Sequence, residues 1–339
     1  MINTPLSNRL LFWFYVLAIL VVGMAALIWP AARAVAYAPL RDLLFPNVFL
    51  PSQASAPVML SVAAPPALEG WLKANTARFT EENPFIQIDV TQLRGLDADN
   101  QLNTLTGQTD VWIAEADFAR TAAGSIPYES QGSSVAQDSF LWVAVKSRQE
   151  LSGRLNWSGV AQAAGGNPQF RIAMPPTQTI EGMAACWSAA SEYPHSGNVT
   201  AAQINDTAFH AWLVRLLQAA PDRNRSPRDQ LSARPPQGEA GLILKSDWSQ
   251  LAQDAFITQP PDHNVIFNFP FYVRTSWPNL QPDEVKAHQD AANTFKQFLL
   301  SSAVQSQLGG YGLERAGSQP GSPLSQADEA TLRALQFCW

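Results

Sequence analysis

Apolar positions in the chain after residue 57 recur at two different spacings, and the two spacings alternate. Residues 58–63 alternate as a strand does, and residues 86–90 repeat that pattern. Between them, apolar residues recur every three or four positions, as on the buried face of a helix, at Leu68, Trp71, Leu72 and Phe79. A strand, a helix and a second strand in this order predict a parallel pair joined by a right-handed crossover.

The same pattern continues towards the C-terminus and predicts the α/β class. A helical stripe lies at 208–217, and Ser246 is predicted to cap another helix. The polar stretch 224–237, which is rich in proline and arginine, is predicted to be an exposed excursion. Further strands are predicted at 110–115, 140–145, 170–174, 240–244 and 265–269.

The N-terminal part of the chain has a different character. An apolar run without a charged residue extends from Leu10 to Trp29. At about 1.5 Å per residue, a helix of this length spans the roughly 30 Å hydrocarbon core of a bilayer. We therefore expect residues 1–30 to form a transmembrane anchor and the proline-rich residues 31–56 to form a membrane-proximal stalk. A cleaved signal peptide is the alternative, because Ala34-Val35-Ala36 offers a small-residue cleavage site.

Composition and motifs exclude several classes of function. The net charge of −6 argues against nucleic-acid binding, which favours basic surfaces. The four histidines have no metal-ligand spacing, and the common nucleotide-binding and nucleophile motifs are missing, so we predict neither an enzyme nor a cofactor. The two cysteines, Cys186 and Cys338, either form a disulfide in an oxidising compartment or are a buried helix cysteine and an unrelated tail cysteine.

Residues 295–315 carry the pattern F-x-x-F-L-L-S-x-x-x-Q-x-x-L-x-x-x-G-L-x-R. Within it, Ser302 and Gln305 are predicted to form a capping box, and Gly309-Gly310 to end the short helix that follows. This segment resembles the closing segment of type 2 bacterial extracellular solute-binding proteins. Further segments resemble that family in the same order along the chain, at 110–115, 155–160, 176–182 and 269–270.

The resemblance implies an α/β, two-lobed type 2 periplasmic-binding-protein fold, here with an N-terminal transmembrane helix. Lobe 1 is expected at 57–141 and 270–316, lobe 2 at 142–269, and a C-terminal tail at 317–339. A protein of this family traps a small-molecule solute for transport by an ABC permease, or signals that the solute is bound. The resemblance also places the large domain outside the cell membrane, as a single-pass protein held by residues 10–29, because the flanking charges do not decide the orientation.

Ligands of open α/β sheets lie outside the carboxyl ends of the strands. That rule selects the loops at 64–68, 115–118, 177–182 and 245–248, with the crossover near Tyr272 as a fifth wall. In the third loop, Thr179 either offers a hydroxyl to the ligand or only caps the helix that follows. The predicted ligand-binding residues are Ala64, Pro65, Glu115, Asp117, Thr177, Thr179, Glu181, Asp247, Trp248 and Tyr272.

The predicted cleft is acidic. Its first loop, Ala64-Pro65-Pro66, offers no hydroxyl and contains two prolines that lack an N–H. Carboxylates disfavour an anion nearby, so we expect a neutral or cationic solute. Trp248 and Tyr272 are either stacking platforms for it or members of the core. The alternative function is a ligand-free scaffold or accessory subunit of a membrane complex. The carboxylates around the predicted cleft are Glu115, Asp117, Glu181 and Asp247.

Overall fold

The computed structural model describes residues 57–93, 109–118, 127–193, 199–220, 222–319 and 323–339. The predicted anchor at 10–29 and the predicted stalk at 31–56 lie outside these ranges. Within the described ranges, no helix has the length and the apolar composition that a membrane span requires.

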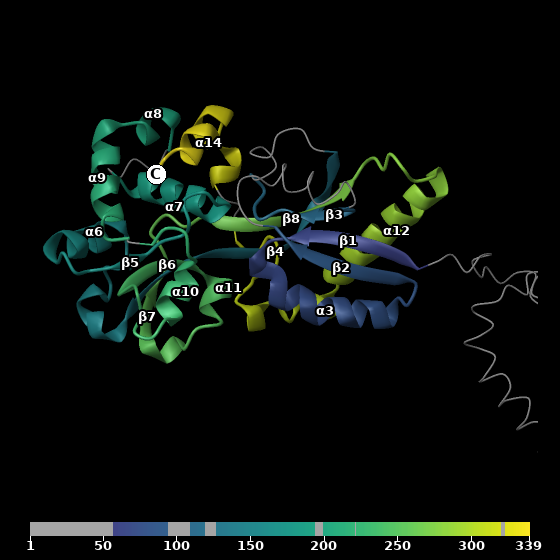
Figure 1. Ribbon diagram of the computed structural model, residues 1–339, viewed down its shortest axis with the longest axis horizontal. Helices are drawn as coiled ribbons and strands as arrows, with labels where there is room; N and C mark the ends of the chain where they lie inside the picture. The colour runs from purple at the N-terminus through teal and green to yellow at the C-terminus, as the bar shows by residue number, and fades with distance from the viewer. Residues whose placement is uncertain (1–56, 94–108, 119–126, 194–198, 221, 320–322) are drawn as a thin grey trace, which may run out of the picture. The chain divides into compact units, whose positions relative to one another are not determined.

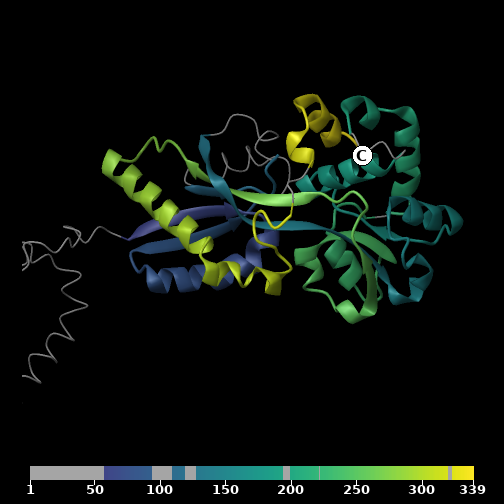
Figure 2. The ribbon, with the colours of Figure 1, turned by 180° about the vertical axis from the view of Figure 1, so that it is seen from behind.

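Five strands form the sheet of the first lobe, in the order β2-β1-β3-β8-β4. β1 runs parallel to β2 and β3, as the β-α-β pattern predicted, and β8 runs antiparallel to β3 and β4. Two helices, α3 and α12, pack on this sheet and on each other (Figure 2). The Phe79 ring of α3 lies 5.1 Å from the Phe295 ring of α12. The bounds are β1 Val58–Ala64, α3 Glu69–Glu82, β2 Ile86–Gln92, β3 Val111–Ile113, β4 Tyr128–Val145, β8 Ile266–Arg274 and α12 Pro282–Leu299.

The second lobe is built on the C-terminal part of β4. That part pairs antiparallel with β6 and β7, and β5 adds to β6 in parallel. Helices surround this smaller sheet (Figure 1). Their bounds are α6 Trp157–Gly166, α7 Ile180–Glu192, α8 Ala201–Ile204, α9 Thr207–Leu217, α10 Pro227–Ser232 and α11 Lys245–Trp248, with β5 Ile172–Ala173, β6 Ala240–Leu244 and β7 Phe256–Gln259.

Two long strands connect the lobes. β4 pairs with β8 as far as Ser139, and from Phe140 onward it pairs with β6. The pairing of β4 with β8 is irregular where Ser134 faces Pro270, which has no N–H to donate. The strand predicted at 140–145 is therefore only the second half of β4. The predicted α/β class and the two-lobed architecture are confirmed.

The C-terminal segment returns across both lobes. Gln137 of β4 and Glu314 exchange backbone hydrogen bonds of 2.8 and 2.9 Å. Beyond them, α14 (Glu329–Gln336) packs on α7 and α8 of the second lobe. The cysteine sulfurs of Cys186 and Cys338 form a disulfide between α7 and the end of the chain, with 6.4 Å between the Cα atoms. The Trp339 indole N–H donates to the Gly182 carbonyl at 3.1 Å.

Three local predictions about helix ends were wrong. The N-cap of α13 (Ser302–Gln305) is Ser301, and no capping box forms, because the Gln305 amide donates to the Val135 and Leu299 carbonyls of the core instead. Gly312, with φ 71°, is the left-handed residue that ends the turn, in place of Gly309-Gly310.

The third concerns α11. Ser246 lies inside this helix, whose N-cap is the apolar residue Leu244. The helix begins two residues earlier than a Ser246 cap would allow, because β6 continues directly into it. The Ser246 hydroxyl is consequently buried within the fold.

Candidate functional site

A cleft with a cavity volume of about 190 Å³ lies where the two lobes meet. The first lobe contributes the short 3-10 helix Pro66–Leu68 (η1), the start of α3, and Glu115, which lies two residues after the end of β3. The second lobe contributes the turn before α7, the start of α10, β6 and α11. The lining residues are Pro66, Ala67, Glu69, Glu115, Phe140, Pro175, Pro176, Thr179, Glu181, Asn224, Ser226, Pro227, Arg228, Leu242, Ile243, Leu244 and Asp247.

The turn before α7 forms one wall of the cleft. The Thr179 hydroxyl accepts from the Gly182 N–H at 3.0 Å and donates to the Pro176 carbonyl at 2.7 Å. The turn is tight at this point, since a Cβ on Gly182 would lie 2.3 Å from the Pro176 oxygen. Thr179 is therefore a helix cap whose only hydroxyl proton is already donated within the protein. A solute at this wall can use it as an acceptor but not as a donor.

Carboxylates dominate the charge of the cleft. Four acidic side chains line it, from Glu69, Glu115, Glu181 and Asp247, against one guanidinium, from Arg228. Nη1 of Arg228 lies 3.2 Å from Asp247 Oδ1 and 2.8 Å from Gln250 Oε1. Among the described residues that line the cleft, Arg228 is the one cation, and it is already paired with Asp247.

Arg228 comes from a segment that the sequence predicted only in part, since most of its residues are exposed but some are buried. The stretch 224–237 was predicted to be an exposed excursion, but it contains α10, and Pro227, Gln230 and Leu231 are buried. Ser226 caps α10 by accepting from the Asp229 N–H at 3.1 Å. A Ser-Pro pair is a typical helix start, so Ser226-Pro227 was the signal that could have revealed this wall of the cleft.

Four of the ten predicted ligand-binding residues line the cleft: Glu115, Thr179, Glu181 and Asp247. They come from three of the selected loops. The loop at 64–68 also reaches the cleft, through Pro66 and Ala67 in place of the predicted residues. The other six predicted residues do not line it: Ala64, Pro65, Asp117, Thr177, Trp248 and Tyr272.

Packing explains why most of these six lie elsewhere. Tyr272 is buried on β8 and stacks on Trp112 with 5.0 Å between ring centroids. Trp248 packs edge-on against Phe256 at 5.8 Å. Asp117 accepts from the Asn268 amide at 3.0 Å. Ala64 and Pro65 are buried where β1 ends. For the two aromatics, the core interpretation fits the structure better than the stacking platform.

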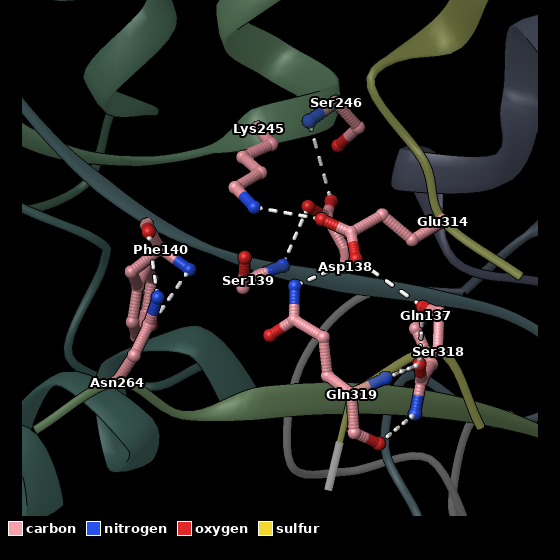
Figure 3. Close-up of polar contacts among 10 residues, drawn as sticks. All are labelled: Gln137, Asp138, Ser139, Phe140, Lys245, Ser246, Asn264, Glu314, Ser318 and Gln319. Atoms are coloured by element: carbon pink, nitrogen blue, oxygen red, sulfur yellow. Dashed lines mark hydrogen bonds and ion pairs between the residues drawn. The ribbon is translucent and has the colours of Figure 1, made fainter. Parts of the chain in front are cut away.

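An acidic residue that the sequence did not suggest lies on β4, two residues before the cleft residue Phe140. Asp138 on β4 is only 2 % exposed. Its carboxylate accepts from the Ser139 N–H at 2.7 Å and from the Ser246 N–H at 3.4 Å (Figure 3). Burial raises the pKa of Asp138 to about 7, and the nearby Asp247 also raises it, while the contacts with Ser246 and Ser139 act in the opposite direction.

A polar network beside Asp138 joins the lobes to the returning C-terminal segment. Lys245 Nζ lies 2.7 Å from Glu314 Oε1, which links α11 to that segment (Figure 3). The side-chain amide of Gln137 donates through its NH2 group to Asn268 Oδ1 at 2.6 Å, and its Oε1 accepts from the Ser318 hydroxyl at 3.0 Å. These contacts hold the two crossover strands and the return segment together at the junction of the lobes.

Among the described residues, no three histidine, cysteine, aspartate or glutamate side chains lie close enough together to hold a metal ion.

The sequence matches no protein-family model and no curated protein. The fold, in contrast, is shared with many solved structures, and it is the two-lobed α/β fold of periplasmic solute-binding proteins. The sulfate-binding protein SubI from Mycobacterium tuberculosis H37Rv matches with a TM-score of 0.58 at 12% identity, over 77% of this chain and 88% of that one.

Two further structures match over similar lengths. The periplasmic binding protein AfuA from Actinobacillus pleuropneumoniae, with fructose-6-phosphate bound, has a TM-score of 0.55 at 12% identity, over 80% of this chain and 89% of that one. The ferric binding protein from Campylobacter jejuni has a TM-score of 0.53 at 14% identity, over 82% and 95%. All three are named as binding proteins, and their ligands differ in charge and size.

Proposed function

We propose that this chain is a solute-binding protein that traps a small neutral or cationic molecule between its two lobes. It delivers that molecule to an ABC permease or reports its presence to another membrane complex. The observation that carries the proposal is the cleft at the junction of the lobes, to which all four sequence-selected loops contribute. Solute-binding proteins of this architecture act by closing two lobes around a ligand through a hinge.

The lining of the cleft supports a solute that is not an anion. The apolar part of the lining comes from prolines and from β6, and it suits the carbon skeleton of an organic molecule. Four of the eight polar residues described in the lining are carboxylates, which suit ammonium groups or hydroxyls that donate hydrogen bonds. The ligand-bearing structures with the same fold include one with maltose bound, so a neutral polyol is within the range of the architecture.

We further propose that residues 10–29 anchor the protein in the cell membrane, with the binding domain on the extracytoplasmic side. The apolar run in the sequence and the disulfide between Cys186 and Cys338 support this placement. Disulfides persist in oxidising compartments and are rare in the cytosol.

A melting-temperature screen of the full chain in mild detergent tests the proposed function. The probes are 1,4-diaminobutane and choline as cations, maltose as a neutral polyol, and sulfate as an anion. A cation or the polyol is expected to raise the melting temperature, because a solute at a hundred times its Kd contributes about 2.7 kcal/mol of stability.

The cleft variant carries two substitutions, Glu181→Gln and Asp247→Asn. The control variant is Asp290→Asn, on the exposed face of α12. The cleft variant should lose the response to a cation, and the control should keep it. A response to sulfate alone would contradict the proposed charge preference. No response to any probe, together with stable partners in native mass measurement, would favour the scaffold function instead.

A further inference from the structure

Asp138 lies directly behind the lining of the cleft. In the paired part of β4, it faces Phe267 of β8, and Phe140 faces Leu244 of β6. Side chains two residues apart on a strand point to the same face of the sheet, so Asp138 and Phe140 share a face. Phe140 lines the cleft. The Asp138 carboxyl is therefore a buried acid on the cleft side of the crossover strand.

The carboxyl contacts the same helix that brings Asp247 to the cleft. Its Oδ2 accepts from the backbone N–H of Ser246, the residue before Asp247 (Figure 3). The Ser246 hydroxyl is buried and makes no hydrogen bond of good geometry within the described part of the chain. Two backbone N–H groups therefore donate to the carboxylate, and the Ser246 side chain also favours its ionised form.

The charged groups near the Asp138 carboxyl lie on α11 and on the returning C-terminal segment. β6 and β8 place only the apolar residues Leu244 and Phe267 beside this part of β4. On α11, Lys245 is paired with Glu314 of the return segment at 2.7 Å. Asp247, also on α11, is the neighbour whose negative charge opposes ionisation of Asp138. Among the described residues, no cation lies within ion-pair distance of Asp138.

Since Asp247 lines the cleft, a positive charge bound beside it must also act on Asp138. On the basis of the proposed solute-binding function, we propose that Asp138 is a specificity-determining residue: a cationic solute in the cleft favours ionised Asp138, which then releases its proton to solvent. Linkage makes the effect reciprocal, so ionisation of Asp138 must strengthen binding of the cation by the same factor.

The direction of the pH dependence follows from the same contacts. Burial raises the pKa of Asp138 to about 7, so the group changes charge between about pH 6 and pH 8. A cation that lowers this pKa by about one unit binds up to about tenfold more tightly above that window than below it. A neutral solute is expected to show no such dependence. The cleft would therefore distinguish solutes by charge through a residue that does not touch them.

The first arm of the test needs no solute. The side-chain carboxyl 13C shift of Asp138 is followed from pH 4 to pH 9 in the full chain and in Asp247→Asn, with Asp290→Asn as the control. The Asp138→Asn variant assigns the resonance, and selective aspartate labelling with a relaxation reagent assigns it if that variant does not fold. Asp247→Asn should lower the titration midpoint, and Asp290→Asn should leave it unchanged. A midpoint that Asp247→Asn does not move overturns the coupling.

The second arm uses 1,4-diaminobutane, which is predominantly doubly protonated up to pH 8.5 and always carries at least one positive charge there. Its Kd should fall by several-fold, up to about tenfold, between pH 6 and pH 8.5 in the wild type. Asp138→Asn should flatten that profile while binding is retained. An unchanged pH profile in Asp138→Asn overturns the coupling. If the diamine binds at no pH, cation binding itself fails, and the first arm still decides whether the cleft and Asp138 are coupled.

Discussion

Serine in place of Cys338 should lower the free energy of unfolding by about 3–5 kcal/mol. The disulfide closes a segment of 152 residues, and a crosslink across so long a segment removes much conformational entropy from the unfolded chain. It also holds the chain end near the start of α7, where Trp339 donates to the Gly182 carbonyl beside the cleft residue Glu181. The loss of the bond should therefore weaken both the fold and the wall of the cleft.

Urea unfolding under non-reducing conditions measures this effect. Cys186→Ser, Cys338→Ser and the double variant should unfold at the same midpoint, because each removes one and the same bond. The wild type in the presence of a reductant should approach them. Detection of free thiols in the unreduced, unfolded wild type would contradict the disulfide, as would a variant of wild-type stability.

Asparagine in place of Asp138 should stabilise the protein at pH 8, by about 2–4 kcal/mol. In the folded protein burial raises the pKa of Asp138 to about 7, from a value of 3.8 for an exposed aspartate. Above about pH 7 the wild type therefore carries a buried charge that the unfolded chain solvates freely. As the pH falls through that pKa and on towards 4, the folded state takes up a proton and the cost of the charge disappears.

The stability difference between Asp138→Asn and the wild type should therefore be largest at pH 8, shrink through pH 6 and be nearly lost at pH 4. Urea midpoints at several pH values measure it. Asp290→Asn is the control, because Asp290 is exposed and its removal should cost little at any pH. An Asp138→Asn variant that is less stable than the wild type at pH 8 would show that the carboxylate is better solvated than its contacts indicate.

The sequence allowed the architecture to be predicted because its signals are periodic and local. Alternation at 58–63 and 86–90 and the helical stripe between them are sufficient for a parallel pair, and the structure contains that pair. The rule that ligands lie at the carboxyl ends of strands then selected loops that do meet at one cleft. Glu115, Thr179, Glu181 and Asp247, which line that cleft, lie in three of these loops.

The remaining features depend on contacts between distant parts of the chain. Asp138 lies in a polar stretch before the strand predicted at 140–145, and nothing local shows that this stretch is buried between α11 and β8. Arg228 reaches the cleft only because α10 packs against β6. Pro270, two residues before Tyr272, suggests a loop in the sequence. In the structure, β8 continues through Pro270 and stacks the Tyr272 ring on Trp112. In each case, the position of the residue depends on the elements that its segment packs against and not on the sequence of the segment itself.

If the two lobes close around a solute, the distance between the lobes must shorten when that solute binds, and measuring this distance tests the closure most directly. Spin labels on non-cysteine anchors at Lys73 of α3 and Arg215 of α9, both exposed, leave the disulfide intact. A solute that raises the melting temperature should shorten the distance between the labels and narrow its distribution, and the Glu181→Gln, Asp247→Asn variant should keep the open distance. An unchanged distance on binding of such a solute would contradict the account.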